Sequence, residues 1–280
     1  MYEAVSGNTY LAKRIVRNYS DMMFAGVVAG NNSGRIWVDG LENPASALVW
    51  SEGLECFQFM GRSSNEIFNN GLKTFINTII IRFLKEKNLK FFEYAADSEE
   101  WYPIINCALS DKEVKEDWQR VYRPGSKTLK DKEIIIPKPY YLYSIDERFF
   151  SAMKYDMKIN NPEFLIKYIE QFWGSMEIYH KLGSGYLAVS GDEIVSFAIA
   201  SALYEKTASI GVETLENHRR KGLASTLVKA LLKELYEKDC NIWWDCMESN
   251  IGSQKTAESA GLIPDHKYKV CWFNFKKIRP

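Results

Sequence analysis

Residues 214–224 read Thr-Leu-Glu-Asn-His-Arg-Arg-Lys-Gly-Leu-Ala, and this stretch decides how the fold is interpreted. It lies between residues 208–214, which are predicted to form a strand, and a helix predicted to begin at Leu223. The first N–H groups of a helix have no intrahelical acceptor, and the helix dipole is positive at that end. A basic, glycine-containing turn at this position is therefore suited to hold a pyrophosphate.

The residue types in the turn fit that role. Gly222 and Ala224 are small where the backbone would approach phosphate oxygens, and Arg219, Arg220 and Lys221 supply positive charge. The alternative for this stretch alone is an ordinary basic helix start with a solvated face.

Two further elements follow the turn. The helix carries an apolar stripe at helical spacing, formed by Leu223, Leu227, Val228, Leu231, Leu232, Leu235 and Tyr236. A short apolar strand is predicted over residues 241–246, and a second helix begins near Asn250. That helix reads Asn250-x-x-Ser253-x-x-x-Ala257-x-x-x-Gly261-Leu262, with a residue type suited to an N-cap at its start and a glycine at its end.

Together these patterns resemble the GNAT superfamily of acetyl-CoA-dependent N-acetyltransferases. The turn is similar to that family's R/Q-x-x-G-x-G/A signature, and the second helix to its N-x-x-A/S-x-x-x-Y-x-x-x-G-F stretch. Two signatures in the right order are more specific than either one. The resemblance implies acetyl-CoA as the cofactor, and it rests on motifs only in the C-terminal half of the chain.

The resemblance also implies which residues touch the cofactor. In the family, a strand N–H contacts the acetyl carbonyl, and alignment gives that contact to the Thr214 backbone. The asparagine and the small residue of the second helix lie beside the pantetheine and adenosine portions. The implied cofactor-binding residues are Val212, Thr214, Arg219, Arg220, Lys221, Gly222, Leu223, Ala224, Ser225, Asn250 and Ser253.

Acetylation of an amine needs a base to remove a proton, and stabilisation of the oxyanion and the departing thiolate. Glu213 and Asp245 are the candidate bases, since both lie on the strands that flank the family's gap between its fourth and fifth strands. For each, the alternative is a solvated or hydrogen-bonded carboxylate. The family's general-acid tyrosine falls at Ala257, which leaves Tyr268, Ser253, water or no acid at all.

The chain is predicted to be an α/β (α+β) protein of two lobes. Its 280 residues exceed one typical domain of about 100–200 residues, and 46% hydrophobic residues suffice for two cores. Turn residues and charge mark residues 126–139 as a linker between an N-terminal lobe, 1–125, and a catalytic lobe, 140–280. The catalytic lobe is expected to have the GNAT fold, with a mixed, mostly antiparallel sheet flanked by helices.

The N-terminal lobe repeats the order of elements without the motif. Predicted strands, a helix over about residues 65–87 and a strand over residues 90–95 mirror the C-terminal lobe. However, residues 61–65, Gly-Arg-Ser-Ser-Asn, do not match the phosphate signature. We therefore interpret residues 1–125 as a degenerate GNAT-like lobe that has lost cofactor binding and walls the substrate cleft.

Composition argues against several function classes. Lys plus Arg and Asp plus Glu each number 36, so no broad basic face suited to nucleic acid is expected. No apolar run reaches the about 18 residues of a membrane span, and the start lacks a signal-peptide pattern, so a cytoplasmic location is expected. Five cysteines without a C-x-x-C pair and three histidines without ligand spacing argue against a disulfide framework and a metal site.

A narrower resemblance suggests the substrate. Residues 210–214 before the turn, and Trp244-Asp245-Cys246 before Asn250, look like two-lobed GNAT proteins that include zwittermicin-type antibiotic-resistance acetyltransferases. This implies acetylation of a primary amine on a small polar molecule, an antibiotic among the candidates. A non-catalytic CoA-binding regulator and a tandem-GNAT aminoacyl- or peptide-directed transferase remain alternatives. The sequence does not fix the oligomeric state, and a homodimer is compatible with it.

Four other side chains have more than one interpretation. Trp173, Trp243 and Trp244 are candidates for lining an acceptor pocket, although core packing is the expected role of at least two of them. His218, beside the basic turn, is interpreted as packing or turn support rather than as a proton carrier.

Overall fold

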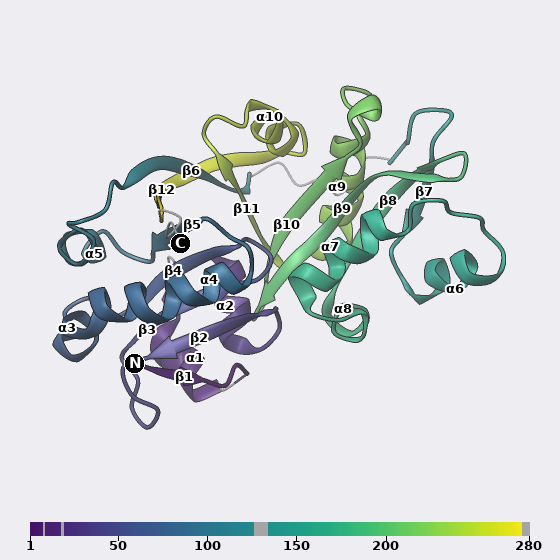
Figure 1. Ribbon diagram of the computed structural model, residues 1–280. Coiled ribbons are helices and arrows are strands. Elements are labelled where there is room, and N and C mark those ends of the chain that lie inside the picture. Colours follow the sequence, from purple (N-terminus) through teal and green to yellow (C-terminus); the bar gives the residue numbers. More distant parts are fainter. Residues whose placement is uncertain (8, 18–19, 126–133, 276–280) are drawn as a thin grey trace. The chain divides into compact units, whose positions relative to one another are not determined.

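The chain forms two compact units in the computed structural model, which describes residues 1–7, 9–17, 20–125 and 134–275 (Figure 1). Unit 1 comprises Met1–Gln119 together with the chain from Tyr268 on, and unit 2 comprises Arg120–Lys267. The expected linker, residues 126–139, lies in part outside the described residues, which omit 126–133.

Unit 1 has a mixed sheet with helices packed against it. Its strand order is β1-β2-β3-β4-β5-β12; β4 and β5 are parallel, and each of the other neighbouring pairs is antiparallel. Its elements are β1 (Tyr2–Ala4), α1 (Thr9–Ile15), α2 (Met22–Ala29), β2 (Gly34–Val38), β3 (Ser46–Ser51), β4 (Cys56–Gly61), α3 (Glu66–Phe75), a π-helical turn (Ile76–Ile80), α4 (Ile81–Glu86), β5 (Phe91–Ala96), α5 (Trp101–Ala108) and the end of β12 (Leu262–Asn274).

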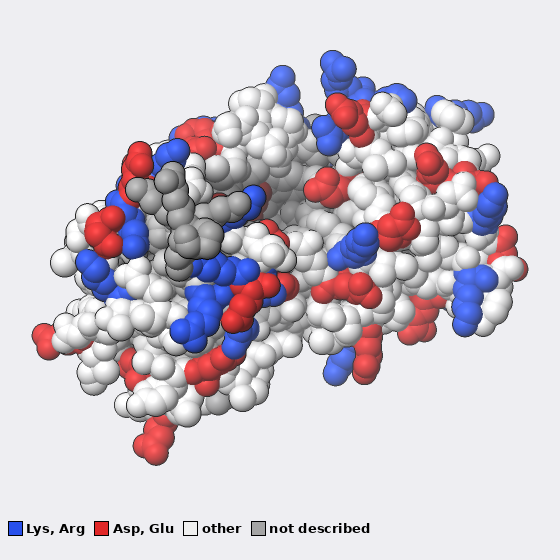
Figure 2. All heavy atoms as spheres, viewed as in Figure 1, with Lys and Arg blue, Asp and Glu red and all other residues white. Residues whose placement is uncertain are grey.

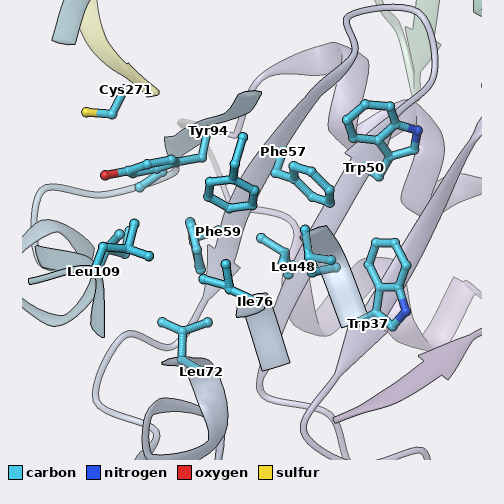
Figure 3. Close-up of a cluster of buried hydrophobic side chains, with 14 of the residues drawn as sticks. Trp37, Leu48, Trp50, Phe57, Phe59, Leu72, Ile76, Tyr94, Leu109 and Cys271 are labelled. Carbon is cyan, nitrogen blue, oxygen red and sulfur yellow. The ribbon is translucent and has the colours of Figure 1, made fainter. Parts of the chain in front are cut away.

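Aromatic side chains fill the core of unit 1 (Figure 3). Phe57 stacks on Phe92 with ring centroids 5.0 Å apart, and Trp50 lies 4.7 Å from Phe57. Strand β3 is buried along its whole length. Because both faces of this sheet are covered, its central strands read as continuous apolar runs rather than as alternating ones.

Unit 2 contains the sheet that was expected around the basic turn. Its strand order is β6-β11-β10-β9-β8-β7; β7 to β10 are antiparallel neighbours, while β10 and β11 are parallel. Its elements are the end of β6 (Lys115–Pro124), β7 (Tyr141–Ser144), α6 (Glu147–Tyr155), α7 (Glu163–Trp173), α8 (Met176–Leu182), β8 (Gly185–Ser190), β9 (Glu193–Tyr204), β10 (Thr207–Thr214), a 3₁₀ turn (Glu216–His218), α9 (Leu223–Glu237), β11 (Asn241–Met247), α10 (Ile251–Ser259) and the start of β12. The predicted fold class, a mixed and mostly antiparallel sheet flanked by helices, is confirmed.

The last strand, β12, differs from the expected arrangement in its partner. It begins in unit 2, but residues 270–274 pair antiparallel with β5 of unit 1, with Val270 opposite Ala95. Cys271 and Phe273 are buried in the unit 1 core. Residues 267–275 alternate between polar and apolar types as a strand does, but such a pattern does not specify the strand with which it pairs.

Both units contain a parallel pair of strands that separates after a few residues. In unit 2 the pairing covers residues 207–209 of β10 and 241–243 of β11, although both strands continue. In unit 1 the corresponding pairing joins residues 57–59 to 94–96. There Asp97 bridges the separation: its N–H donates to the Phe59 carbonyl at 3.0 Å, and its carboxylate accepts from the Gly61 N–H at 2.8 Å.

The surface carries charges of both signs. On the face shown in Figure 2, Lys and Arg side chains alternate with Asp and Glu side chains, in keeping with equal totals of each. In the described parts of the chain, no helix has both the length and the apolar character needed to cross a membrane.

Asp97 makes the stability of unit 1 depend on pH. Burial raises its pKa to about 6, although the Gly61 N–H, the Trp101 indole and Arg17 oppose the shift. An unfolded aspartate has a pKa of about 3.9, so the folded state binds this proton more tightly. We expect the free energy of unfolding to fall by about 3 kcal/mol in total through this group as the pH rises from well below about 4 to well above about 6.

Urea unfolding of the natural chain and of Asp97→Asn, each at several pH values across this window, tests the expectation. The variant cannot titrate at this position, so its stability should lose that share of the pH dependence. Identical pH dependence in the two proteins would contradict the assignment.

Candidate functional site

A cavity of about 640 Å³ opens in unit 2 beside the end of β10 and the starts of α9 and α10. Its volume lies within the about 300–1,000 Å³ typical of small-molecule sites. It is lined by Val212, Glu213, Thr214, His218, Arg219, Arg220, Gly222, Leu223, Ala224, Ser225, Asn250, Gly252, Ser253, Lys255, Thr256 and Ser259.

The end of β10 presents backbone donors away from β9. The Leu215 N–H donates to the Val195 carbonyl of β9 at 2.9 Å, and the Glu213 carbonyl accepts from the Ser196 hydroxyl at 2.8 Å. Backbone groups alternate in direction along a strand. Val212 and Thr214 therefore direct their N–H groups to the opposite edge, where β10 has separated from β11.

The turn before α9 leaves the helix start open. Gly222, the residue before the helix, has a φ of +78°, and no atom lies within 4 Å of the position that a Cβ would occupy. No side chain caps α9. The Arg219 side chain donates to the Thr214 carbonyl at 3.1 Å, which ties the turn to the strand end. Open N–H groups with two arginines beside them at a helix start are an arrangement suited to an anion.

His218 supports this turn from the side. Its Nδ1 lies 3.0 Å from the Tyr140 hydroxyl, and the two rings meet edge to face. Lys221 is the one expected cofactor residue that does not line the cavity; its ammonium lies 6.0 Å from the centre of the Tyr140 ring.

Helix α10 forms the second wall. The Asn250 side chain caps its start by accepting from the Ser253 N–H at 3.0 Å. The Ser253 hydroxyl accepts from the Trp244 indole at 3.2 Å, and its hydrogen bond with Cys246 partly opposes the rise that burial causes in the pKa of that thiol. The Ser259 hydroxyl donates to the Ser225 hydroxyl of α9 at 2.8 Å, which links the two helices.

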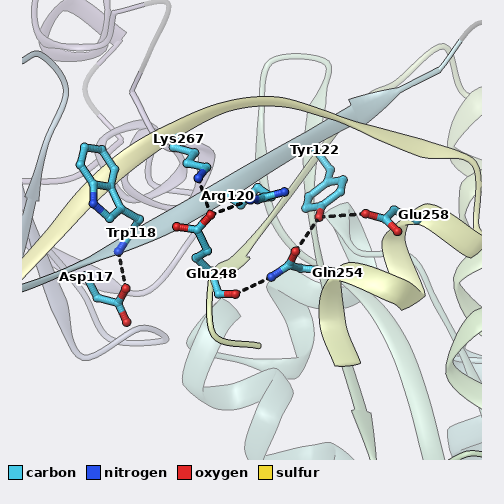
Figure 4. Close-up of polar contacts among 8 residues, drawn as sticks. All are labelled: Asp117, Trp118, Arg120, Tyr122, Glu248, Gln254, Glu258 and Lys267. Atoms are coloured by element: carbon cyan, nitrogen blue, oxygen red, sulfur yellow. Dashed lines mark hydrogen bonds and ion pairs between the residues drawn. The ribbon is translucent and has the colours of Figure 1, made fainter. Parts of the chain in front are cut away.

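A polar network holds the connection between β11 and α10 (Figure 4). The Glu248 carboxylate accepts from Arg120 at 2.6 Å and from Lys267, and these bonds lower the pKa of Glu248. Gln254 donates to the Glu248 carbonyl at 2.6 Å and accepts from the Tyr122 hydroxyl at 3.3 Å. The first turn of α10 is thus fixed from behind the cavity.

The two expected bases differ in position. Glu213 lines the cavity, and Asp245 of β11 does not. Val212 packs against the core beneath α9, so Glu213 faces the other side of the sheet, where Tyr168 of α7 lies. Burial raises the pKa of Glu213, and Arg219 partly opposes the shift. Burial also raises the pKa of Tyr168, and the charge of Glu213 adds to that effect.

Five lining residues were not predicted as site residues: His218, which was interpreted as packing or turn support, and Gly252, Lys255, Thr256 and Ser259. Steps of three residues along α10 from Asn250 and Ser253 lead to Thr256 and Ser259, so helical spacing was the available signal. The three candidate tryptophans, Trp173, Trp243 and Trp244, are all buried. Among the described residues, no three His, Cys, Asp or Glu side chains are placed to hold a metal ion.

The chain matches known proteins along most of its length. A family model described as GNAT acetyltransferase matches residues 13–271. An uncharacterized N-acetyltransferase, YdfB of Bacillus subtilis (strain 168), is 23% identical over 237 residues, which covers 85% of this chain and 84% of YdfB.

Solved structures share the fold. A GCN5-related N-acetyltransferase-like protein from Streptococcus suis 89/1591 is similar with a TM-score of 0.61 and 19% identity, covering 95% of this chain and 96% of that one. A tandem GNAT protein from the clavulanic acid biosynthesis pathway has a TM-score of 0.59 and 11% identity, covering 96% of both chains.

The contact between Gly211 of β10 and Tyr168 of α7 can be tested by substitution. A Cβ added at Gly211 would lie 1.8 Å from the Tyr168 hydroxyl oxygen, and the next nearest atom, the ring Cζ, would be at 3.0 Å. We expect Gly211→Ala to cost about 1–3 kcal/mol of stability. Adding Tyr168→Phe should recover much of that loss because the clashing oxygen is removed. Denaturant unfolding of both single variants and the double variant measures the coupling, and strictly additive effects would contradict this contact.

Proposed function

The chain belongs to the GNAT acetyltransferase family, and on that premise we propose that it transfers the acetyl group of acetyl-CoA to a primary amine of a small polar molecule. The observation that carries the proposal is the cavity where the separated end of β10 meets the uncapped start of α9. We further propose an antibiotic as the acceptor, because residues 210–214 and 244–246 resemble the corresponding stretches of antibiotic-resistance acetyltransferases.

The residues of this cavity fit acetyl-CoA. The open N–H groups that follow Gly222, with Arg219 and Arg220 beside them, are suited to hold the pyrophosphate. The outward N–H groups of Val212 and Thr214 are suited to hold the amide and acyl carbonyls of the pantetheine arm. When bound, acetyl-CoA supplies an acetyl group activated as a thioester.

We assign the general base to Glu213. Its carboxylate lines the cavity, and its raised pKa moves it closer to the range in which a carboxylate accepts a proton effectively near neutral pH. Asp245 is the weaker candidate because it does not line the cavity. The aromatic side chains of Phe164 and Tyr168 pack on Phe197 on the α7 side, and the charge of Glu213 acts on Tyr168 there.

We assign the proton donor for the departing thiolate to Ser253. Its hydroxyl lines the cavity and is oriented by the Trp244 indole. Tyr268 is less suited, because its hydroxyl already donates to Asp21 at 2.9 Å. Ala257, at the position of the family tyrosine, is fully buried in the core.

We propose that unit 1 has no working acetyl-CoA site of this kind. At the matching place, Asn65 precedes α3; its side chain caps the helix by accepting from the Phe68 N–H and also donates to Asp39 at 2.8 Å. Asp97 bridges the separated strands. A negative charge and satisfied N–H groups occupy the positions that bind phosphate in the proposed unit 2 site.

Gly222→Glu tests the cofactor site. The added carboxylate would enter the place proposed for the pyrophosphate, so we expect affinity for acetyl-CoA to fall at least a hundredfold in calorimetric titration. Gly191→Glu is the matched control: Gly191 also has a positive φ, +58°, and open space around it, and it lies in the β8–β9 turn of the same unit. Equal loss of binding in both variants, or none in either, would refute the site.

Glu213→Gln tests the base. In the natural chain, kcat/KM is expected to rise with pH through the raised pKa of Glu213, because only the deprotonated carboxylate accepts the proton. The Gln variant should lose this limb and about 10²–10⁴-fold in rate while it still binds acetyl-CoA. Asp245→Asn should keep the limb. If Asp245→Asn loses it instead, the roles of the two carboxylates are reversed.

A further inference from the structure

A small hollow in unit 1 is surrounded by positive charge. Its volume is about 250 Å³, and we call it the basic hollow; it is lined by Lys13, Arg14, Arg17 and Arg62, together with Pro44 and Ala45. The cations come from two separate parts of the chain, the region of α1 and the residue after β4. The acetyl-CoA site, in contrast, is proposed in unit 2.

Hydrogen bonds fix two of the cationic residues on the α1 side. The Arg14 Nε donates to the Pro44 carbonyl at 2.9 Å, which leaves its terminal nitrogens for other acceptors. The Arg17 N–H donates to the Ser20 hydroxyl at 2.9 Å, and the Arg17 carbonyl accepts from the Ser20 N–H at 3.0 Å. The backbone of Arg17 is thus tied to Ser20.

Arg62 is fixed on the opposite side of the basic hollow. Its N–H donates to the Ala45 carbonyl at 2.8 Å, and its carbonyl accepts from the Ser46 hydroxyl at 2.6 Å. These bonds continue the pairing of β3 with β4 beyond Gly61. The cations are therefore carried by ordered backbone, and this lowers the entropic cost of gathering them around a ligand.

The positive charge has little compensation within the protein. Among the ion pairs between described residues, none involves the four cations of the basic hollow. The charge of Arg17 does act on Asp97, but both Asp97 oxygens already accept hydrogen bonds, from the Gly61 N–H and the Trp101 indole. The dipole of α1 favours Lys13 at its last turn, but it does not explain Arg62.

We propose that the basic hollow binds a small, multiply charged oxyanion, namely phosphate or the phosphate group of a small metabolite. Like charges gathered in one place repel, and an anion with several negative charges relieves that repulsion. Arginine forks match the oxygens of phosphate in pairs. The volume lies below the about 300 Å³ at which sites for drug-sized ligands begin, so one phosphate group fits and a nucleotide does not.

The test is calorimetric titration of inorganic phosphate at low salt into the full chain carrying Gly222→Glu, which blocks the phosphate site proposed in unit 2. We expect binding that weakens as ionic strength rises. Adding Lys13→Gln and Arg62→Gln should weaken phosphate binding at least tenfold. Among the described residues, neither side chain makes a hydrogen bond or an ion pair, so we expect the double variant to fold. Adding Arg82→Gln and Lys90→Gln, exposed cations of the same unit, removes the same charge and should leave affinity unchanged.

Glucose 6-phosphate in the same titration distinguishes the two sources of phosphate. Tighter binding than inorganic phosphate indicates a phosphorylated metabolite, and equal or weaker binding indicates the free ion. Absence of phosphate binding at low salt, or equal weakening in the two double variants, overturns the proposal. Because acetyl-CoA binding is measured separately in the chain with native Gly222, failure here leaves the proposed acetyl transfer untouched.

Discussion

The short pairing between β10 and β11 is the constraint on which the candidate site depends. Only residues 207–209 and 241–243 are joined, so β10 continues with one edge of its backbone unpaired by β11. Unpaired backbone groups inside a protein are costly unless a ligand or water satisfies them. Helix α9, anchored by its buried leucines, begins beside this edge and adds its own free N–H groups. The unpaired strand edge and the uncapped helix start thus border one cavity.

Much of this arrangement could be predicted from residues near one another in sequence. The basic turn, the stripe of α9 and Asn250 each reflect local rules of helix starts and apolar periodicity, and the cavity brings them together. What could not be predicted depends on partners far away in the chain. Asp245, like Glu213, is an acidic residue on a strand beside the gap, yet it does not line the cavity. The way in which the two strands separate decides which side chains face the cavity, and that depends on the tertiary structure. The strand with which β12 pairs could not be predicted for the same reason.

The two units differ at a few residues where a parallel strand pair meets the start of a helix. Each contains a parallel strand pair that separates, followed by a helix. In unit 1, Asp97 ties the strands and Asn65 caps the helix, while in unit 2 the helix follows Gly222 without a cap. A carboxylate or an amide side chain supplied by the protein can thus satisfy the same kinds of backbone donor that a ligand would otherwise bind.

The path of β12 has a consequence for how the chain is made. Unit 1 contains residues from both ends of the described chain, and all of unit 2 lies between them in sequence. On the ribosome, the sheet of unit 1 cannot be finished when its first 119 residues emerge, because β5 lacks the neighbour that residues 270–274 provide. Unit 2 can fold earlier, since its strands are synthesised without such an interruption. Cutting the chain near residue 120 would therefore yield an N-terminal fragment with an exposed sheet edge and an incomplete core.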